Sequence, residues 1–295
     1  MIITNDLCKI YGEKPVVKDL NMHAKKGSIY GLIGLNGAGK TTTLGMLSGL
    51  IKPTSGTFTI GGYSMDESSK IRDIISLMPQ DSHFHNERTV MSHMELYCGL
   101  KDVDIFKAEE LLIHLGLGEK LYTKVKALSH GMVKRLNLSQ ALIAHPQLIM
   151  LDEPLSGLDP KTKSHIRAAI KKYSKKSTVV ISSHELDEVE ALCDYVGIIH
   201  KGTIIKESKV ASLTLPHKEV SFKIANLNEK MINAVDIKYV KDVITAKNTI
   251  TVIYSKDISQ KLTNLLLKNK AKILSIRKGK RLEEVFLSEI SNYDL

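Results

Sequence analysis

The chain up to about residue 212 switches repeatedly between short apolar runs and helical spacing of apolar residues. Residues 67 to about 145 are mostly helical in pattern, and a helix with Leu44, Leu47 and Leu50 on one face follows residue 40. Strand-like runs lie at residues 2–10, 16–24, 28–34, 57–64, 148–152, 178–183, 195–202 and 203–208. Because strands that alternate with helices are typical of parallel sheets covered by helices, this part predicts an α/β fold.

The pattern breaks at residues 212–219 and then restarts. A strand, a short helix, a hairpin, a helix, a strand and a last amphipathic helix follow, at residues 221–225, 228–235, 242–255, 257–269, 273–279 and 281–290. That order resembles the split βαβ of a small ferredoxin-like α+β module. Its candidate core residues are Val220, Phe222, Ile224, Val252, Leu265, Ile273 and Phe286. We therefore predict two domains, residues 1–212 and 217–295, with a helical subdomain at about 81–145 in the first.

The composition is that of an ordinary globular protein. The 295 residues are 43% hydrophobic and 25% charged, which excludes disordered and fibrous architectures. No run approaches the ~18 apolar residues that cross a bilayer, and the first residues lack the apolar core of a secretory signal. Cys8, Cys98 and Cys193 are far apart and odd in number, as is typical of reduced thiols in a cytosol. We expect a soluble cytosolic protein.

Positive charge is concentrated near the C-terminus. Residues 200–295 carry 18 Lys and Arg against 10 Asp and Glu, whereas residues 1–199 carry 24 against 22. Such a region indicates either a solvated lysine-rich face or an anionic partner, such as nucleic acid or a membrane surface. Since no aromatic-studded basic stripe of the kind that stacks bases accompanies the charge, we favour the solvated face and expect no nucleic-acid partner.

A glycine-rich segment separates the apolar run at 28–34 from the helix that follows. It reads Gly-Leu-Asn-Gly-Ala-Gly-Lys-Thr over residues 34–41, so that consecutive backbone N–H groups can converge on phosphate oxygens. Lys40 then reaches the β- and γ-phosphates, and the Thr41 hydroxyl ligates Mg²⁺. The segment predicts an ATP and Mg²⁺ site formed by Asn36, Gly37, Ala38, Gly39, Lys40, Thr41 and Thr42.

An acidic pair, Asp152 and Glu153, ends the apolar run at 148–152. Adjacent carboxylates on a strand point to opposite sides, so one can serve Mg²⁺ while the other faces the attacking water. An acidic pair after a strand is commonly only a turn. The phosphate loop upstream makes the catalytic interpretation the better one.

Three further motifs complete a recognisable order: LSHGM at 128–132, SGLDP at 156–160 and SSHELDE at 182–188. With the phosphate loop and the acidic pair, they resemble the ATP-binding cassette of an ABC transporter, over residues 1 to about 212. The resemblance implies a P-loop NTPase core with a helical subdomain and an antiparallel β subdomain.

The resemblance also implies which residues touch nucleotide and metal. Tyr11 stands where the family stacks an aromatic ring on adenine, with Val17 beside it. Gln80 matches the loop that senses Mg²⁺ and the membrane partner, and Asp152 matches the Mg²⁺ aspartate. The implied metal site is therefore Thr41, Gln80 and Asp152.

Catalytic roles are implied in the same way. Glu153 matches the residue that polarises water, and His184 matches the switch that contacts the γ-phosphate, with Gln80 as the third catalytic residue. Asp159 matches the loop that crosses the dimer seam.

The signature motif departs from the family's usual LSGGQ. Ser129 and Gly131 are kept, whereas His130 replaces a glycine and Met132 replaces the glutamine. In the family this loop caps the ATP bound to the opposite subunit through the serine hydroxyl and backbone N–H groups. A side chain at residue 130 strains the loop only if the backbone there needs positive φ. The variant is similar to that of exporters for drugs and antimicrobial peptides, including self-immunity pumps; a weakened site is the alternative.

Together these features indicate the ATPase subunit of a bacterial exporter for a drug, a lipid or an antimicrobial peptide. The resemblance implies a homodimer or heterodimer of cassettes at the cytoplasmic face of the membrane, with the permease on a separate chain. An importer subunit is one alternative, and a soluble ATPase acting on ribosomes or DNA is another. DNA-repair relatives insert a long coiled coil, but only 86 residues separate Thr41 from Leu128. The cargo is not encoded in these motifs.

Overall fold

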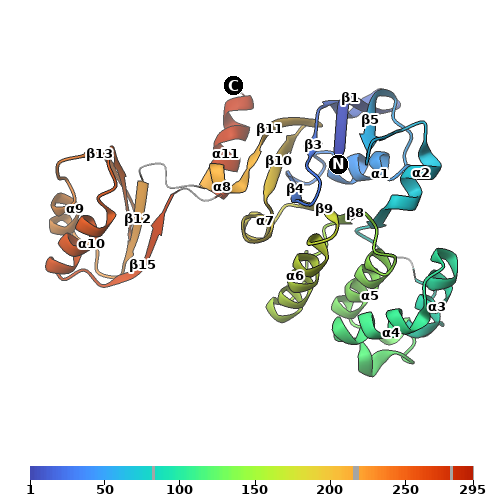
Figure 1. Cartoon of the computed structure of the whole chain (residues 1–295). Coiled ribbons are helices and arrows are strands. Elements are labelled where there is room, and N and C mark those ends of the chain that lie inside the picture. Colours follow the sequence, from blue (N-terminus) through green and yellow to red (C-terminus); the bar gives the residue numbers. More distant parts are fainter. Residues whose placement is uncertain (82–83, 215–218, 280–281, 295) are drawn as a thin grey trace. The chain divides into compact units, whose positions relative to one another are not determined.

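The computed structural model describes residues 1–81, 84–214, 219–279 and 282–294 and divides into two compact units (Figure 1). The first unit comprises Met1–Lys209 with Glu289–Leu295, and the second comprises Val210–Ser288.

A six-stranded sheet forms the centre of the first unit. Its strand order is β11 (Thr203–Lys209), β10 (Tyr195–His200), β4 (Ile29–Ile33), β9 (Thr178–Ser183), β8 (Leu148–Asp152) and β7 (Ile75–Met78). The neighbours from β10 to β7 are parallel, and β4, β8 and β9 are buried throughout, as strands covered on both faces must be. The α/β prediction is confirmed. Strand β7 lies in a region expected to be mostly helical, because an apolar run of four residues fits either structure.

Helices α1 (Lys40–Leu47), α6 (Pro160–Ser174) and α7 (Leu186–Leu192) pack on this sheet, against β8, β9 and β4 respectively. Leu44 and Leu47 of α1 are buried as predicted. Leu50 is 74% exposed, because α1 has already ended at Leu47 and the chain turns at Gly49 with φ 77°.

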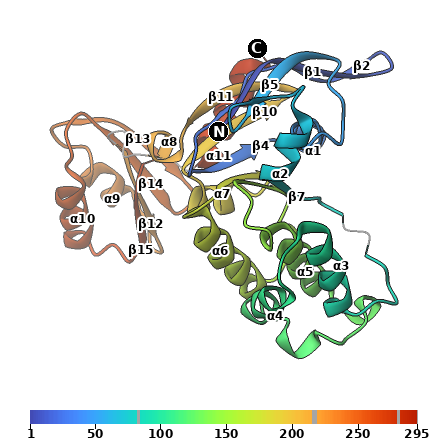
Figure 2. The same ribbon diagram turned by 45° about the vertical axis from the view of Figure 1, so that its right-hand side comes forward.

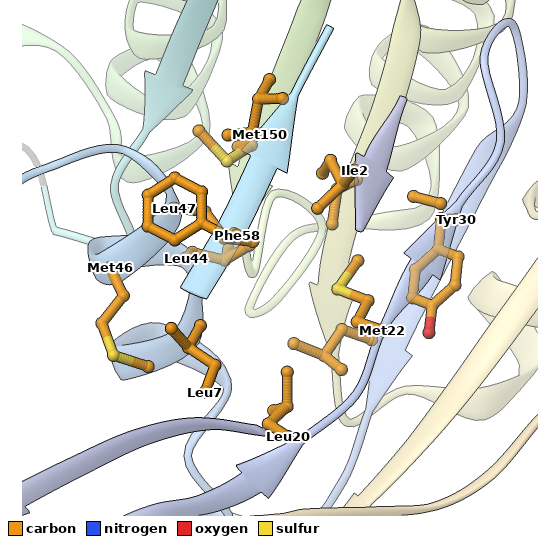
Figure 3. Close-up of a cluster of buried hydrophobic side chains, with 14 of the residues drawn as sticks. Ile2, Leu7, Leu20, Met22, Tyr30, Leu44, Met46, Leu47, Phe58 and Met150 are labelled. Carbon is orange, nitrogen blue, oxygen red and sulfur yellow. The ribbon is translucent and has the colours of Figure 1, made fainter. Parts of the chain in front are cut away.

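A second, antiparallel sheet lies over α1 in the first unit. Its order is β2 (Lys14–Leu20), β1 (Ile2–Tyr11), β5 (Ser55–Ile60) and β6 (Tyr63–Ser64), with β3 (His23–Ala24) paired to β1. Figure 3 shows the apolar side chains that this sheet, α1 and the parallel sheet share; Leu44 and Leu47 lie beside Phe58 there. This shared core fixes α1, and therefore the loop in front of it, relative to both sheets.

The helical subdomain groups α3 (Val90–Lys101), α4 (Ile105–His114) and α5 (His130–Leu142), as Figure 2 shows. The N-cap residues Thr89, Asp104 and Ser129 each accept a hydrogen bond from a backbone N–H of the first turn. 3₁₀ turns at Gly118–Lys120 and Val125–Ala127 complete the region, whereas α2 (Ser68–Ile74) contacts β6 and β7 instead. Within the described ranges, no helix has both the length and the apolar composition needed to cross a membrane.

The second unit contains the predicted order of elements. Its sheet runs β13 (Val240–Ala246), β14 (Thr249–Tyr254), β12 (Glu219–Ile224) and β15 (Ile273–Lys278), with antiparallel neighbours throughout. Helices α9 (Glu229–Ala234) and α10 (Ser259–Lys268) make the crossovers, and the short α8 (Val210–Thr214) precedes the sheet. Because β12 lies between β14 and β15, the two halves interleave as in a ferredoxin-like module.

Most of the predicted core of this unit is present. Val220, Phe222, Ile224 and Val252 belong to one buried cluster, and Ile273 packs against it. Leu265 is only half-buried and lies outside this cluster. The buried face of α10 instead carries Leu262 and Leu266, one helical turn apart. Phe286, on helix α11 (Leu282–Tyr293), is buried but is not among the residues of this cluster.

The end of α11 belongs to the first unit, which the sequence did not predict. Asp294 accepts hydrogen bonds from Lys201 Nζ at 2.7 Å and from His200 Nε2 at 3.0 Å, and Glu289 pairs with Lys206 at 3.3 Å. The domain boundaries 1–212 and 217–295 differ from this grouping at the C-terminus. As statements about independent folding they stay predictions, and residue 217 lies outside the described residues.

Candidate functional site

The glycine-rich loop lies between β4 and α1, where the sequence predicted it. Gly37 and Gly39 have φ of 79° and 108°, a region that favours glycine. A Cβ on Gly39 would lie 2.9 Å from the carbonyl oxygen of Val16. Gly202 N, at the β10–β11 turn, donates to Ala38 O at 3.1 Å and braces the loop from behind. The loop is therefore held open at the N-terminus of α1, the geometry that receives phosphate oxygens.

A cleft of about 410 Å³ opens in front of this loop. It is lined by Val16, Asn36, Gly37, Gly39, Lys40, Thr41, Thr42, Gln80, Glu153, Ser156 and His184. The structure thus brings together most of the residues that the motifs singled out, and adds Val16 and Ser156. A larger cavity of about 490 Å³ lies elsewhere, beside Leu111 and Tyr173, away from these residues.

Lys40 is buried at the base of the cleft, with 6% of its surface exposed. Its Nζ donates to Gly34 O at 2.9 Å and lies 3.4 Å from Glu153 Oε1. A buried ammonium in this position is suited to binding phosphate oxygens, because the low local dielectric strengthens the electrostatic attraction between them.

Glu153 and His184 follow adjacent parallel strands, β8 and β9, so the carboxyl ends of these strands bring them together. His184 Nδ1 lies 3.0 Å from Glu153 Oε1 and 2.9 Å from Oε2. Since a carboxylate only accepts, Nδ1 carries the hydrogen of this contact. The pair places a buried carboxylate, oriented by an imidazole, on the wall of the cleft.

The backbone of Glu153 is unusual. Its φ of 49° lies in the left-handed region, which costs a non-glycine residue about 1–2 kcal/mol. Its N–H donates to Ser182 Oγ at 2.9 Å, and the same hydroxyl donates to Asp152. The turn after β8 is thus held by β9. Because Glu153 lies beyond the strand and has left-handed backbone, strand alternation does not apply to it, and the opposite directions of the two carboxylates stay a prediction.

The proposed metal ligands Thr41, Gln80 and Asp152 are all oxygen donors, which suits a hard cation such as Mg²⁺. Thr41 and Gln80 line the cleft, and Asp152 is buried directly before Glu153. Their chemistry fits the ion, and their assignment stays a prediction.

Helix α5 contributes two buried polar residues that the motifs did not single out. Lys134 Nζ donates to Gln80 O at 2.8 Å and to Glu153 O at 3.3 Å, and Asn137 Nδ2 donates to Pro79 O at 3.0 Å. Burial lowers the pKa of Lys134, and the carboxylates of Asp81, Asp152 and Glu153 oppose that shift. The sequence did carry a signal. Lys134 and Asn137 share the buried face of α5 with Leu138 and Ala141, where a charged side chain is unexpected.

The signature residues lie at the N-terminus of α5. Ser129 is the N-cap and accepts from Met132 N at 3.4 Å. His130 is the first helical residue and has no positive φ, so its side chain imposes no backbone strain. Asp159 caps α6, and its hydrogen bonds with Thr162 hold the pKa of its carboxyl below the usual range. Ser129, Gly131 and Asp159 lie outside the lining of the cleft.

Tyr11 and Val17 were predicted to contact adenine. Tyr11 ends β1, is 47% exposed and has Lys9 Nζ 4.9 Å from its ring centroid. Val17 is fully buried in the core, and its neighbour Val16 lines the cleft instead. The adenine contacts of Tyr11 and Val17 stay predictions.

Comparison with known proteins agrees with this geometry. Residues 17–156 match the family model described as ABC transporter. The chain is 32% identical to the linearmycin resistance ATP-binding protein LnrL of Bacillus subtilis, over 90% of this chain and 89% of that protein. It is 35% identical to the bacitracin transport ATP-binding protein BcrA of Bacillus licheniformis, over 98% of this chain and 97% of that protein.

A solved structure shares the fold of the first unit. It is a dimeric ATP-binding cassette in a post-hydrolysis state, bound to ADP and Pi, with a TM-score of 0.66 and 26% identity. The match covers 71% of this chain and 99% of that structure. The sequence similarity extends over nearly the whole length. Together with the phosphate loop and the buried carboxylate beside it, this similarity identifies an ATPase. The chain therefore belongs to the family of ABC transporter ATP-binding proteins.

Proposed function

We propose that this chain is the ATP-hydrolysing subunit of a bacterial exporter that moves a drug, a lipid or an antimicrobial peptide through a separate membrane subunit. Support comes from the two relatives matched over nearly their full length, which are named for bacitracin transport and linearmycin resistance. We place it at the cytoplasmic face of the membrane, where ATP is available.

The observation that carries the catalytic part is the Glu153–His184 pair beside Lys40 in one cleft. Lys40 binds the β- and γ-phosphate oxygens. Glu153 polarises the attacking water and takes up its proton, because it is a buried carboxylate within the cleft. His184 orients that carboxylate and contacts the γ-phosphate.

Thr41, Gln80 and Asp152 would hold Mg²⁺, which supplies positive charge to the phosphate oxygens when it is bound. In this assignment Gln80 also belongs to the loop that senses the membrane partner. Its backbone is tethered to α5, so a displacement of the helical subdomain displaces the loop as well.

The signature residues support a dimer. Ser129 is exposed at the N-terminus of a 13-residue helix, outside the lining of its own cleft. A helix N-terminus with a serine hydroxyl is suited to binding phosphate oxygens. We propose that Ser129 and Gly131 cap the ATP bound by a second cassette, identical or related, and that Asp159 lies at the seam between the two.

The surface of the helical subdomain supports a protein partner. Leu96, Leu100, Phe106 and Tyr122 on and near α3 and α4 are between 51% and 81% exposed. Leu96 and Leu100 are one helical turn apart and so share one face of α3, and exposed apolar faces mark interaction surfaces. We propose that the membrane permease docks there.

The export proposal is tested by producing the chain with the permease that co-purifies with it in a bacterium sensitive to bacitracin and linearmycin. Resistance that requires both proteins, and that is lost in the Glu153→Gln variant, is the expected result. Substrate accumulation inside the cell would instead identify an importer. Co-purification with ribosomes or DNA in place of a permease would identify a non-transport ATPase.

A further inference from the structure

Lys134 is a buried cation whose side-chain hydrogen bonds join two of the proposed catalytic residues. It is 5% exposed, and its Nζ donates to two carbonyl oxygens, Glu153 O at 3.3 Å and Gln80 O at 2.8 Å. Glu153 and Gln80 are 19 and 54 residues away in sequence. A single side chain of α5 therefore bridges two separate segments that line the cleft.

The turn at Glu153 needs such a bridge. Its left-handed backbone conformation is unfavourable for a residue with a side chain, and it persists only where the surroundings hold it. The Glu153 N–H donates to the buried Ser182 hydroxyl. The Glu153 C=O accepts from the buried Lys134 ammonium at 3.3 Å and, within the turn itself, from Ser156 N at 3.4 Å. Ser182 anchors the turn to the sheet, whereas Lys134 anchors it to the helical subdomain.

We propose that Lys134 is a positioning residue for ATP hydrolysis, which fixes the Glu153 backbone and with it the direction of the catalytic carboxylate. The inference rests on the proposed catalytic role of Glu153. It also connects the two nucleotide sites of a dimer. Helix α5 would cap the partner's ATP with Ser129 at its N-terminus. Five residues later, Lys134 of the same helix holds Glu153, the general base of this subunit's own site.

Asn137 provides a matched control on the same helix. It is buried like Lys134 and donates to Pro79 O, next to Gln80, but no hydrogen bond joins it to Glu153 among the described residues. A loss of turnover caused only by a loosened Gln80 loop is expected in variants at either position. A loss caused by a misdirected carboxylate is expected only at Lys134.

The test measures ATP affinity and single-turnover hydrolysis for the full chain and for Lys134→Met, Lys134→Gln and Asn137→Leu. Methionine keeps most of the volume but donates nothing, whereas glutamine keeps N–H donors on a shorter, uncharged side chain. We expect ATP affinity within about twofold in all three, and a turnover loss of about tenfold or more for Lys134→Met, with Lys134→Gln between it and the parent. Asn137→Leu is expected to lose less than Lys134→Met.

A second measurement separates positioning from general destabilisation. In the Glu153→Gln background, Lys134→Met should cause no further loss, because residues that act through the same group are not additive. Three outcomes would each overturn the proposal. Lys134→Met could lower turnover by the same factor in both backgrounds, it could leave turnover normal, or Asn137→Leu could lower turnover equally. If Lys134→Met does not fold, as judged by its melting temperature, Lys134→Gln carries the same comparison. Normal hydrolysis by Glu153→Gln alone would instead refute the assignment of Glu153, independently of Lys134.

Discussion

The two units of this chain differ in how many charged side chains they bury. The first unit buries Lys40, Lys134, Asp152 and Glu153 within or beside one cleft. Among the described residues of the second unit, Glu219 is the buried charged side chain, and the main cluster is formed by apolar residues and Tyr254. Burying a charge is costly unless it is paired, so four charges in one place indicate a role other than stability.

Left-handed backbone at non-glycine residues occurs in both units, but in different surroundings. In the second unit Tyr239, Lys247 and Lys270 have φ of 84°, 50° and 61°, and all three are exposed. In the first unit Glu153 has φ of 49°, is buried beside the cleft and is held by side chains from two other elements. Such a conformation is ordinary in an exposed turn, whereas at a buried residue of a cleft it indicates a functional site.

The largest effects are expected from the buried charges of the first unit. Glu153→Gln should keep ATP binding but lower steady-state hydrolysis by about 100-fold or more, because the attacking water loses its polarising carboxylate. It should also trap a closed ATP-bound dimer.

Lys40→Ala should weaken ATP affinity itself, because a charge that binds phosphate is lost. Nucleotide titration and phosphate release distinguish the two, and near-normal turnover of Glu153→Gln would remove that residue from its role.

Two substitutions in the signature motif distinguish a steric block of the opposing ATP from the loss of a side chain's own contacts. Ser129→Arg should abolish hydrolysis by blocking the phosphate of the opposing subunit. His130→Ala should leave turnover within about threefold of the parent, because His130 has ordinary helical backbone geometry and contributes through its N–H. Phosphate release by the purified dimer measures both. A large loss in His130→Ala would show that the imidazole takes part.

Ending the chain after Lys209 tests whether the second unit serves catalysis at all. We expect ATP affinity within about twofold, since the removed residues contain none of the nucleotide motifs, but a lower dimer fraction or weaker stimulation by the permease. Circular dichroism establishes that the shortened chain folds.

The end of α11 needs its own control, because the shortened chain also loses Asp294. Asp294→Asn in the full chain weakens the contacts with His200 and Lys201 and leaves the second unit intact. A fall in ATP affinity in both variants would locate the effect at the β10–β11 turn, which braces Ala38 of the phosphate loop. Unchanged dimerisation and coupling in the shortened chain would refute a role of the second unit in either.

The smallest effect concerns an exposed carboxylate of the second unit. Hydrogen bonds from Ser259 and then from Lys278 lower the pKa of Asp257 from 3.8 to about 2. The stability that Asp257 contributes is therefore fully present above its ordinary pKa and is lost as the pH falls through about 2. Carboxyl titration by NMR should show this pKa, and Lys278→Met should raise it only partly, because the bonds from Ser259 are the larger cause. A return to the ordinary value in Lys278→Met would contradict that order.

The sequence by itself determined the local parts of this protein. The glycine-rich loop, the carboxylates at the end of β8 and the histidine after β9 are short motifs, and each can be recognised from a few consecutive residues. The repeat of strand and helix beyond residue 219 likewise follows from local periodicity. Of its predicted core residues, Val220, Phe222, Ile224, Val252 and Ile273 belong to or pack against the buried cluster. Phe286 lies outside that cluster, and on α10 Leu262 and Leu266 face inward in place of Leu265.

Only the tertiary structure decided which of these parts meet. Glu153 and His184 are 31 residues apart and come together because β8 and β9 are adjacent in the sheet. Lys134 reaches two loops that are far from it in sequence, and the end of α11 returns to β10. Strand order and the packing of α5 depend on the whole core rather than on any short segment. Contacts between distant residues could therefore not be predicted from local patterns.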